Sequence, residues 1–89
     1  MNIKGSKTEK NLEQAFAAES KARNAYTFYA EAAKKSGQPL LADAFMEIAQ
    51  NEEEHARGHY EFLGRIRDSL TNLETAVHGE HYEATTIYP

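Results

Sequence analysis

Apolar residues recur at alternating steps of three and four along two long segments of the chain, which is the spacing of one face of an α-helix. In the second segment this apolar stripe consists of Leu41, Phe45, Ile48, Phe62 and Ile66. The same register places Glu52, His55 and His59 on the stripe, between its two apolar halves. Unpaired carboxylates are costly to bury, so a cation is expected to compensate them. The pattern therefore predicts a helix whose inner face holds metal ligands.

The first long segment shows the same interruption. Its stripe consists of Leu12, Phe16, Ala22, Tyr26, Ala30 and Ala33. The next register position after Phe16 is Glu19, so a carboxylate is expected on the inner face of this helix too. Taken together, the two stripes predict a core that contains Phe16, Phe45, Phe62, Leu63 and Ile66.

Capping and turn residues indicate where the first two helices begin and end. Ser6 followed by Glu9 reads as a capping box that opens a helix over about residues 7–35. The segment 36–39, Ser-Gly-Gln-Pro, combines a glycine suited to a left-handed cap with a proline suited to a first helical turn. A second helix is therefore expected over about residues 39–67, antiparallel to the first.

A third helix is expected over about residues 72–88, opened by a second capping box at Thr71 and Glu74. One side of it would carry Leu73, Ala76, Val77, Glu80, Ala84 and Ile87. Glu80 is again a carboxylate on an apolar face. Because this face would have no packing partner within the chain, the sequence predicts a fragment or one half of an assembly.

Length and composition favour one small all-α domain that covers residues 1–89. Alanine is frequent, glycine and proline are scarce, and apolar and polar residues do not alternate long enough to suggest a strand. A chain of 89 residues buries only a modest fraction of its surface when it folds alone. We therefore expect it to need a partner.

Charge and cysteine content exclude several classes of function. The formal net charge is −4 and the ten basic residues are scattered, which argues against nucleic acid as a partner. There is no cysteine, so neither a disulfide framework nor a thiolate-ligated metal is available. No signal-like or membrane-spanning apolar run is present, so we expect a cytoplasmic protein without a membrane partner.

The spacing of the acidic and histidine residues points to a particular kind of metal site. Glu52 and His55, three apart, face the same way, and so do Glu80 and Glu83. Di-iron four-helix bundles take one Glu from each of two helices and a Glu-x-x-His pair from each of the other two. With Glu19, the first two helices supply half of that set. Oxygen ligands with imidazole and no thiolate suit iron or manganese, and zinc could also occupy the site.

Four ordered blocks of the sequence resemble the di-iron domain of rubrerythrins, a ferritin-like family. The blocks are residues 4–11 (KGSKTEKN), 17–26 (AAESKARNAY), 52–56 (EEEHA) and 79–83 (GEHYE), the last followed by Tyr88-Pro89. Glu-x-x-His alone is a weak signal, but four blocks in one order are specific. The resemblance covers nearly the whole chain and implies a ferritin-like helical hairpin with a partial third helix.

The resemblance also implies roles for individual residues. Glu19, Glu52, Glu80 and Glu83 would be carboxylate ligands, with Glu52 and Glu80 bridging two irons. His55 would replace Glu83 on one iron when the site is reduced, so these two residues would form a redox toggle. The implied chemistry is that of a peroxidase, an oxidoreductase that reduces hydrogen peroxide to water with two electrons.

Two departures from the family bear on the partners that we expect. A typical rubrerythrin has a fourth helix with another Glu-x-x-His, and commonly a rubredoxin module with four cysteines. The four-helix bundle is therefore expected to be completed by a second chain that supplies the fourth helix and the remaining ligands, as in a cleaved or domain-swapped protein. The alternative is a homodimer in which two hairpins pair. Electrons would come from an external, rubredoxin-like protein.

Other interpretations of the sequence remain open beside the peroxidase. The chain could be a ferritin-like iron-binding protein or ferroxidase, in which iron is the substrate. It could also be a structural helical fragment that binds metal opportunistically. Among individual residues, Glu53 and Glu54 are expected on a solvated acidic face, His59 as a packing residue or behind the ligands, and His78 and His81 at the surface.

Overall fold

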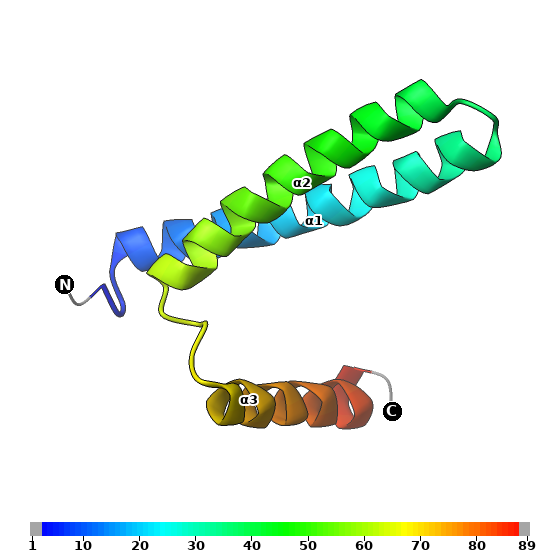
Figure 1. Cartoon of the computed structure of the whole chain (residues 1–89). Coiled ribbons are helices and arrows are strands. Elements are labelled where there is room, and N and C mark those ends of the chain that lie inside the picture. The colour runs from blue at the N-terminus through cyan, green and yellow to red at the C-terminus, as the bar shows by residue number, and fades with distance from the viewer. Residues whose placement is uncertain (1–2, 88–89) are drawn as a thin grey trace.

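The computed structural model describes residues 3–87 of the chain, and within that range it contains helices and no strand. Its elements are α1 (Lys7–Lys35), α2 (Pro39–Phe62), α3 (Ser69–Tyr82) and the short π-helix η1 (Glu83–Ile87). α1 and α2 run side by side as a long hairpin, and α3 follows after a loop (Figure 1). The all-α class and the hairpin with a further helix are confirmed.

The first helix begins where the sequence predicted it. The backbone N–H of Glu9 donates to the hydroxyl oxygen of Ser6 at 3.1 Å. The carboxylate of Glu9 in turn accepts from the backbone N–H of Gly5 at 3.0 Å. Two backbone donors at the helix start are thereby satisfied, in a variant of the capping box in which Glu9 accepts from Gly5 and not from Ser6.

The turn between α1 and α2 also has the expected form. Gly37 adopts a φ of 73°, a left-handed conformation that glycine reaches without strain. The backbone N–H of Gln38 donates to the carbonyl oxygen of Ala33 at 2.9 Å, and Pro39 starts α2. This is the hydrogen-bond pattern of a Schellman motif, so the chain reverses within three residues of the end of α1.

Helix α2 ends at Phe62 and not near residue 67, so the sequence-based boundary was too late. The cause is Gly64, whose φ of 71° is left-handed. The N–H of Gly64 donates to the carbonyl of Glu61 at 2.9 Å, and the N–H of Arg65 donates to that of Tyr60 at 3.1 Å. These two bonds form a second Schellman motif, which ends the helix although the apolar stripe continues to Ile66.

Helix α3 begins at Ser69, earlier than predicted, because Asp68 and not Thr71 is its N-cap. One carboxylate oxygen of Asp68 accepts from the backbone N–H of Thr71 at 3.0 Å, and the other accepts from the hydroxyl of Thr71 at 2.8 Å. These hydrogen bonds lower the pKa of Asp68. The capping box expected at Thr71 and Glu74 was wrong, and the predicted end at residue 88 lies outside the described residues.

Small side chains line the contact between α1 and α2. The buried residues of the described chain are the alanines Ala30, Ala33, Ala42, Ala49 and Ala56. Aromatic rings flank this alanine seam: Phe16 stacks on Tyr60 with 4.5 Å between ring centroids, and Phe45 contacts Tyr29 at 5.6 Å. Tyr26 joins the second group through Tyr29 and Phe45, so its ring fills space between the helices.

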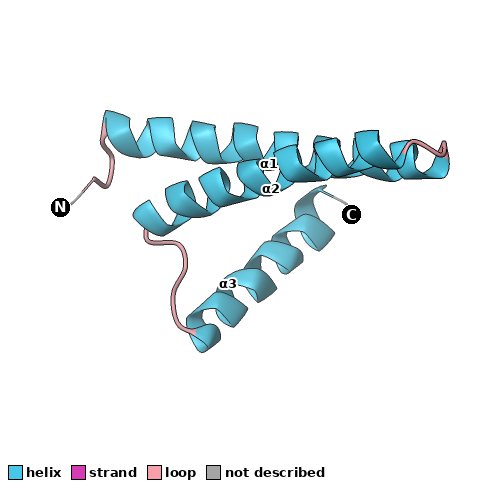
Figure 2. Cartoon of the chain, turned by 45° about the horizontal axis from the view of Figure 1, so that its top comes forward, coloured by secondary structure: helices cyan, strands magenta, loops and turns pink. Residues whose placement is uncertain are grey.

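Helix α3 packs against neither helix of the hairpin in the described part of the chain. Figure 1 shows it apart from the hairpin, and Figure 2 shows it inclined to the hairpin. The apolar side chains that were expected in the core are exposed as a result: Phe62 is 59% exposed and Ile66 is 50% exposed. The core prediction was therefore wrong for these two residues, because no element covers them.

None of the helices within residues 3–87 is both long and apolar enough to cross a membrane.

Candidate metal centre

Three residues with metal-binding side chains converge at the middle of the hairpin. Glu19 projects from α1, and Glu52 and His55 project from the facing side of α2. One ligand atom from each of the three lies within 4.8 Å of the other two. The convergence follows from the helical repeat, since residues three apart share a face and the antiparallel hairpin brings that face against Glu19.

The two carboxylate oxygens of Glu19 face two different histidines. Oε1 lies 3.8 Å from Nδ1 of His55, and Oε2 lies 3.1 Å from Nε2 of His59. Oε2 is buried and, despite this proximity, lacks a hydrogen bond with acceptable geometry. A buried carboxylate oxygen without a donor is costly, so the site is arranged for a cation.

The donor set fits an iron ion. Two carboxylates and one imidazole offer hard and intermediate ligands, and iron and manganese accept this combination, as zinc does. The two negative charges would be offset by a divalent cation. Because one ion takes more ligands than three side chains supply, further donors are needed from other groups.

The neighbouring acidic residues have other roles. Glu53 lies 3.5 Å from Arg23 of α1 and 3.3 Å from Arg57, one turn away on α2, so it forms ion pairs at the surface. Glu54 is exposed. Of the three consecutive glutamates, Glu52 is therefore the one that faces the cluster, as its phase in the apolar stripe predicted.

Aromatic contacts lie on both sides of the cluster along the hairpin. Phe16, one turn before Glu19, stacks on Tyr60 of α2 with an angle of 19° between the rings. Tyr26, two turns after Glu19, contacts Phe45 of α2 at 6.2 Å. These contacts fix the spacing of α1 and α2 where the ligands project.

The structure does not bring Glu80 and Glu83 to this cluster. Glu80 lies on α3, Glu83 begins η1, and both are exposed. Since α3 does not pack on the hairpin, neither carboxylate contributes to the group formed by Glu19, Glu52 and His55. His78 and His81 are exposed on the same helix.

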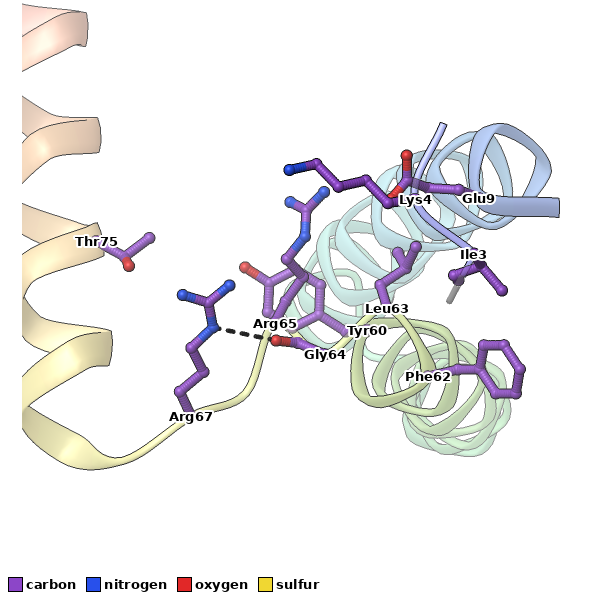
Figure 3. A pocket seen from close by; sticks show the side chains of 10 residues that line it. All are labelled: Ile3, Lys4, Glu9, Tyr60, Phe62, Leu63, Gly64, Arg65, Arg67 and Thr75. Atoms are coloured by element: carbon purple, nitrogen blue, oxygen red, sulfur yellow. Dashed lines mark hydrogen bonds between the residues drawn. The ribbon is translucent and has the colours of Figure 1, made fainter. Parts of the chain in front are cut away.

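A hollow of about 650 Å³ lies at the end of the hairpin where α2 gives way to the loop (Figure 3). Lys4, Arg65 and Arg67 extend into this space, while Phe62 points to the opposite side. Arg65 also forms an ion pair with Glu13 of α1. The hollow contains none of the candidate ligands, so the chemistry is to be sought at the carboxylate and histidine cluster.

His59 lies closer to the cluster than its sequence pattern indicates. The sequence predicts a packing residue or one behind the ligands, yet its Nε2 atom lies 3.1 Å from the buried Oε2 of Glu19. The signal in the sequence was its spacing of four residues from His55, which places both imidazoles on one face of α2.

Comparison with known proteins identifies a family. The sequence model described as "Rubrerythrin" matches residues 10–89. The chain is 46% identical over 101 residues to the rubrerythrin of Porphyromonas gingivalis, an alignment that covers 99% of this chain and 50% of the relative. The corresponding identity is 42% for the rubrerythrin of Nitratidesulfovibrio vulgaris, covering 99% of this chain and 53% of the relative.

A third relative extends the same comparison. The rubrerythrin of Clostridium perfringens is 38% identical over 105 residues, covering 99% of this chain and 54% of the relative. The chain thus spans about half the length of the curated relatives that it matches.

Proposed function

Because this chain belongs to the rubrerythrin family, we propose that it forms part of a non-haem di-iron centre that reduces hydrogen peroxide to water. The observation that supports this best is the approach of Glu19, Glu52 and His55 to within 4.8 Å of one another, from two helices. A peroxidase of this kind would act in the cytosol and limit oxidative stress.

When bound, two ferrous ions supply the two electrons that, with two protons, convert one hydrogen peroxide molecule into two water molecules. The chain's own residues would hold the ions: Glu19 and Glu52 would supply carboxylate oxygens, and His55 would supply an imidazole nitrogen. The side chain of His55 is 61% exposed, which leaves this side of the cluster accessible to a small solute such as hydrogen peroxide.

Glu83 would be a further carboxylate ligand of the iron that His55 would bind, and these two residues would form the redox toggle that the resemblance implies. This toggle requires Glu83 to approach the cluster, either by a movement of α3 or from another copy of the chain. Glu83 begins a π-helix, and such segments are frequent at functional sites. Glu80 would arrive with it, because Glu80 lies in the last turn of α3 and η1 follows α3 directly.

We further propose that another polypeptide completes the site. Leu70, Leu73 and Val77 of α3 are 74%, 60% and 58% exposed, and a contiguous apolar face of this kind is typical of an interface. The preferred partner is a second chain that contributes a helix with the remaining ligands. A homodimer, in which two copies of Glu19, Glu52 and His55 meet, is the alternative. The electrons would come from a separate, rubredoxin-like protein.

The peroxidase is tested by single-turnover oxidation of the ferrous-loaded protein. Hydrogen peroxide should oxidise the iron much faster than dissolved oxygen does. The E52Q variant should lose bound iron and this reaction, whereas the matched E54Q variant should keep both, since Glu54 is exposed outside the cluster. Faster oxidation by oxygen than by peroxide would contradict the proposal.

A ferritin-like ferroxidase is a second candidate, and the exposure of His55 favours it as well, because iron that is a substrate must enter and leave. Repeated additions of ferrous iron distinguish the two. A ferroxidase continues to oxidise iron with oxygen and accumulates ferric mineral, whereas a peroxidase stops when its resident ions are oxidised. Native mass spectrometry of the iron-loaded protein gives the assembly and the number of ions it holds.

A further inference from the structure

His55 and His59 lie four residues apart on α2, and both present a ring nitrogen to Glu19. Two histidines at this spacing on one helix face form a recurrent metal-binding pair. His55 approaches one carboxylate oxygen of Glu19, with 3.8 Å between Nδ1 and Oε1. His59 approaches the other, with 3.1 Å between Nε2 and Oε2. Each oxygen of the Glu19 carboxylate therefore faces a different imidazole.

The contact between His59 and Glu19 is not a regular hydrogen bond. Oε2 of Glu19 is buried and has no hydrogen-bond partner, although Nε2 of His59 lies 3.1 Å from it. Two ligand atoms in cis on one metal ion, each about 2.1 Å from it, are about 3 Å apart and do not point at each other. The observed pair has this separation.

We propose that His59 is a second imidazole ligand of the metal centre, bound through Nε2 to an ion that it shares with Oε2 of Glu19. This inference rests on the proposed function, in that it requires the hairpin to bind metal. On α2, His59 lies one turn beyond His55. It therefore adds a donor to the group formed by Glu19, Glu52 and His55, on the side towards Tyr60.

The position of His59 suits a ligand better than a surface residue. Its side chain is 31% exposed, half the value for His55, so it lies deeper between the helices. The stacked rings of Phe16 and Tyr60 flank this position. Phe16 lies one helical turn before Glu19 on α1, and Tyr60 directly follows His59 on α2. With His59 included, the hairpin alone provides two carboxylates and two imidazoles. The centre would then require fewer ligands from other helices.

The test uses the full chain loaded with Co²⁺, a paramagnetic probe for the divalent ion. Each imidazole bound to Co²⁺ gives a strongly shifted, exchangeable N–H signal in the proton NMR spectrum. We expect the H59L variant to lose one such signal and to bind Co²⁺ at least about tenfold more weakly. H78L serves as the matched control, since His78 is exposed on α3, and it should retain the parent signals and affinity.

A second variant separates a ligand from a residue that only positions Glu19. The side chain of H59Q keeps an N–H donor near Oε2 but has no imidazole, so it should also lack the signal if His59 binds the ion. If H59L and H59Q retain every shifted signal of the parent, the proposal is wrong, while the metal centre of the proposed function stands. If the parent protein binds neither Co²⁺ nor Fe²⁺, both are wrong.

Discussion

The ring of Tyr60 stacks on the ring of Phe16 with 4.5 Å between their centroids, which ties the last turn of α2 to α1 one turn before Glu19. Stacked aromatic pairs contribute about 0.5–1.5 kcal/mol beyond their burial. This contact therefore bears on both the stability of the hairpin and the placement of the ligands.

A double-mutant cycle measures the contribution of this pair. F16L, Y60L and the double variant should show a coupling free energy of unfolding of about 1 kcal/mol, obtained from denaturant titrations. The variants should also bind Fe²⁺ more weakly, because the stack holds the helices together beside Glu19. Strictly additive effects of the two substitutions would show that the rings do not stabilise each other.

Metal binding should stabilise the hairpin. An ion that binds the folded state alone at 100 times its dissociation constant adds about 2.7 kcal/mol. We expect chelation of the metal to lower the melting temperature of the parent and of E54Q, and to leave that of E52Q unchanged, because E52Q has lost a carboxylate of the cluster. An equal fall in all three proteins would place the stabilising ion elsewhere.

Two glycines near the end of α2 should respond in opposite directions to the same substitution. Gly64 has a φ of 71°, so G64A forces a left-handed alanine and should destabilise the protein by about 1 kcal/mol. Gly58 lies inside α2, and an added Cβ would meet nothing within 4 Å. G58A should therefore stabilise the protein by about 0.5–1 kcal/mol. Denaturant titration of both variants measures the change in the free energy of unfolding. Changes of the same sign in G64A and G58A would contradict the assignment of Gly64 as the residue that ends α2.

The start of α3 should depend on pH through Asp68. Hydrogen bonds from Thr71 lower the pKa of this carboxyl, so its charged form stabilises the helix start. That stabilisation is complete above the ordinary aspartate pKa and is lost as the pH falls through the lowered value in the folded state. Asparagine caps a helix about as well as aspartate and does not titrate. Below the ordinary pKa the parent should therefore lose more helical circular dichroism than D68N does.

The hairpin could be predicted from the sequence because its signals are local. The cap at Ser6 and the turn at Gly37 and Pro39 depend on a few neighbouring residues. The structure forms the turn as predicted and the capping box with Gly5 in place of Ser6 as the donor to Glu9. The group of Glu19, Glu52 and His55 was also expected, since it follows from helical phase and one antiparallel contact.

The sequence did not predict features that depend on competition between two local signals or on contacts between distant residues. The apolar stripe continues beyond Phe62, yet the left-handed Gly64 ends α2, because local backbone geometry outweighs a periodic pattern. Asp68, and not Thr71, is the N-cap of α3, because its carboxylate accepts two hydrogen bonds from Thr71. The position of α3 depends on packing partners that the pattern of its own side chains does not specify.

The alanine seam between α1 and α2 has a consequence for how the ligands are held. Alanine has no side-chain rotamers to lose, so closing this contact costs no side-chain conformational entropy. The backbone, with few large side chains between the helices, sets how near Glu19 comes to Glu52. An ion that arrives would therefore find its ligands already close together, and little of its binding free energy would be spent on bringing the two helices together.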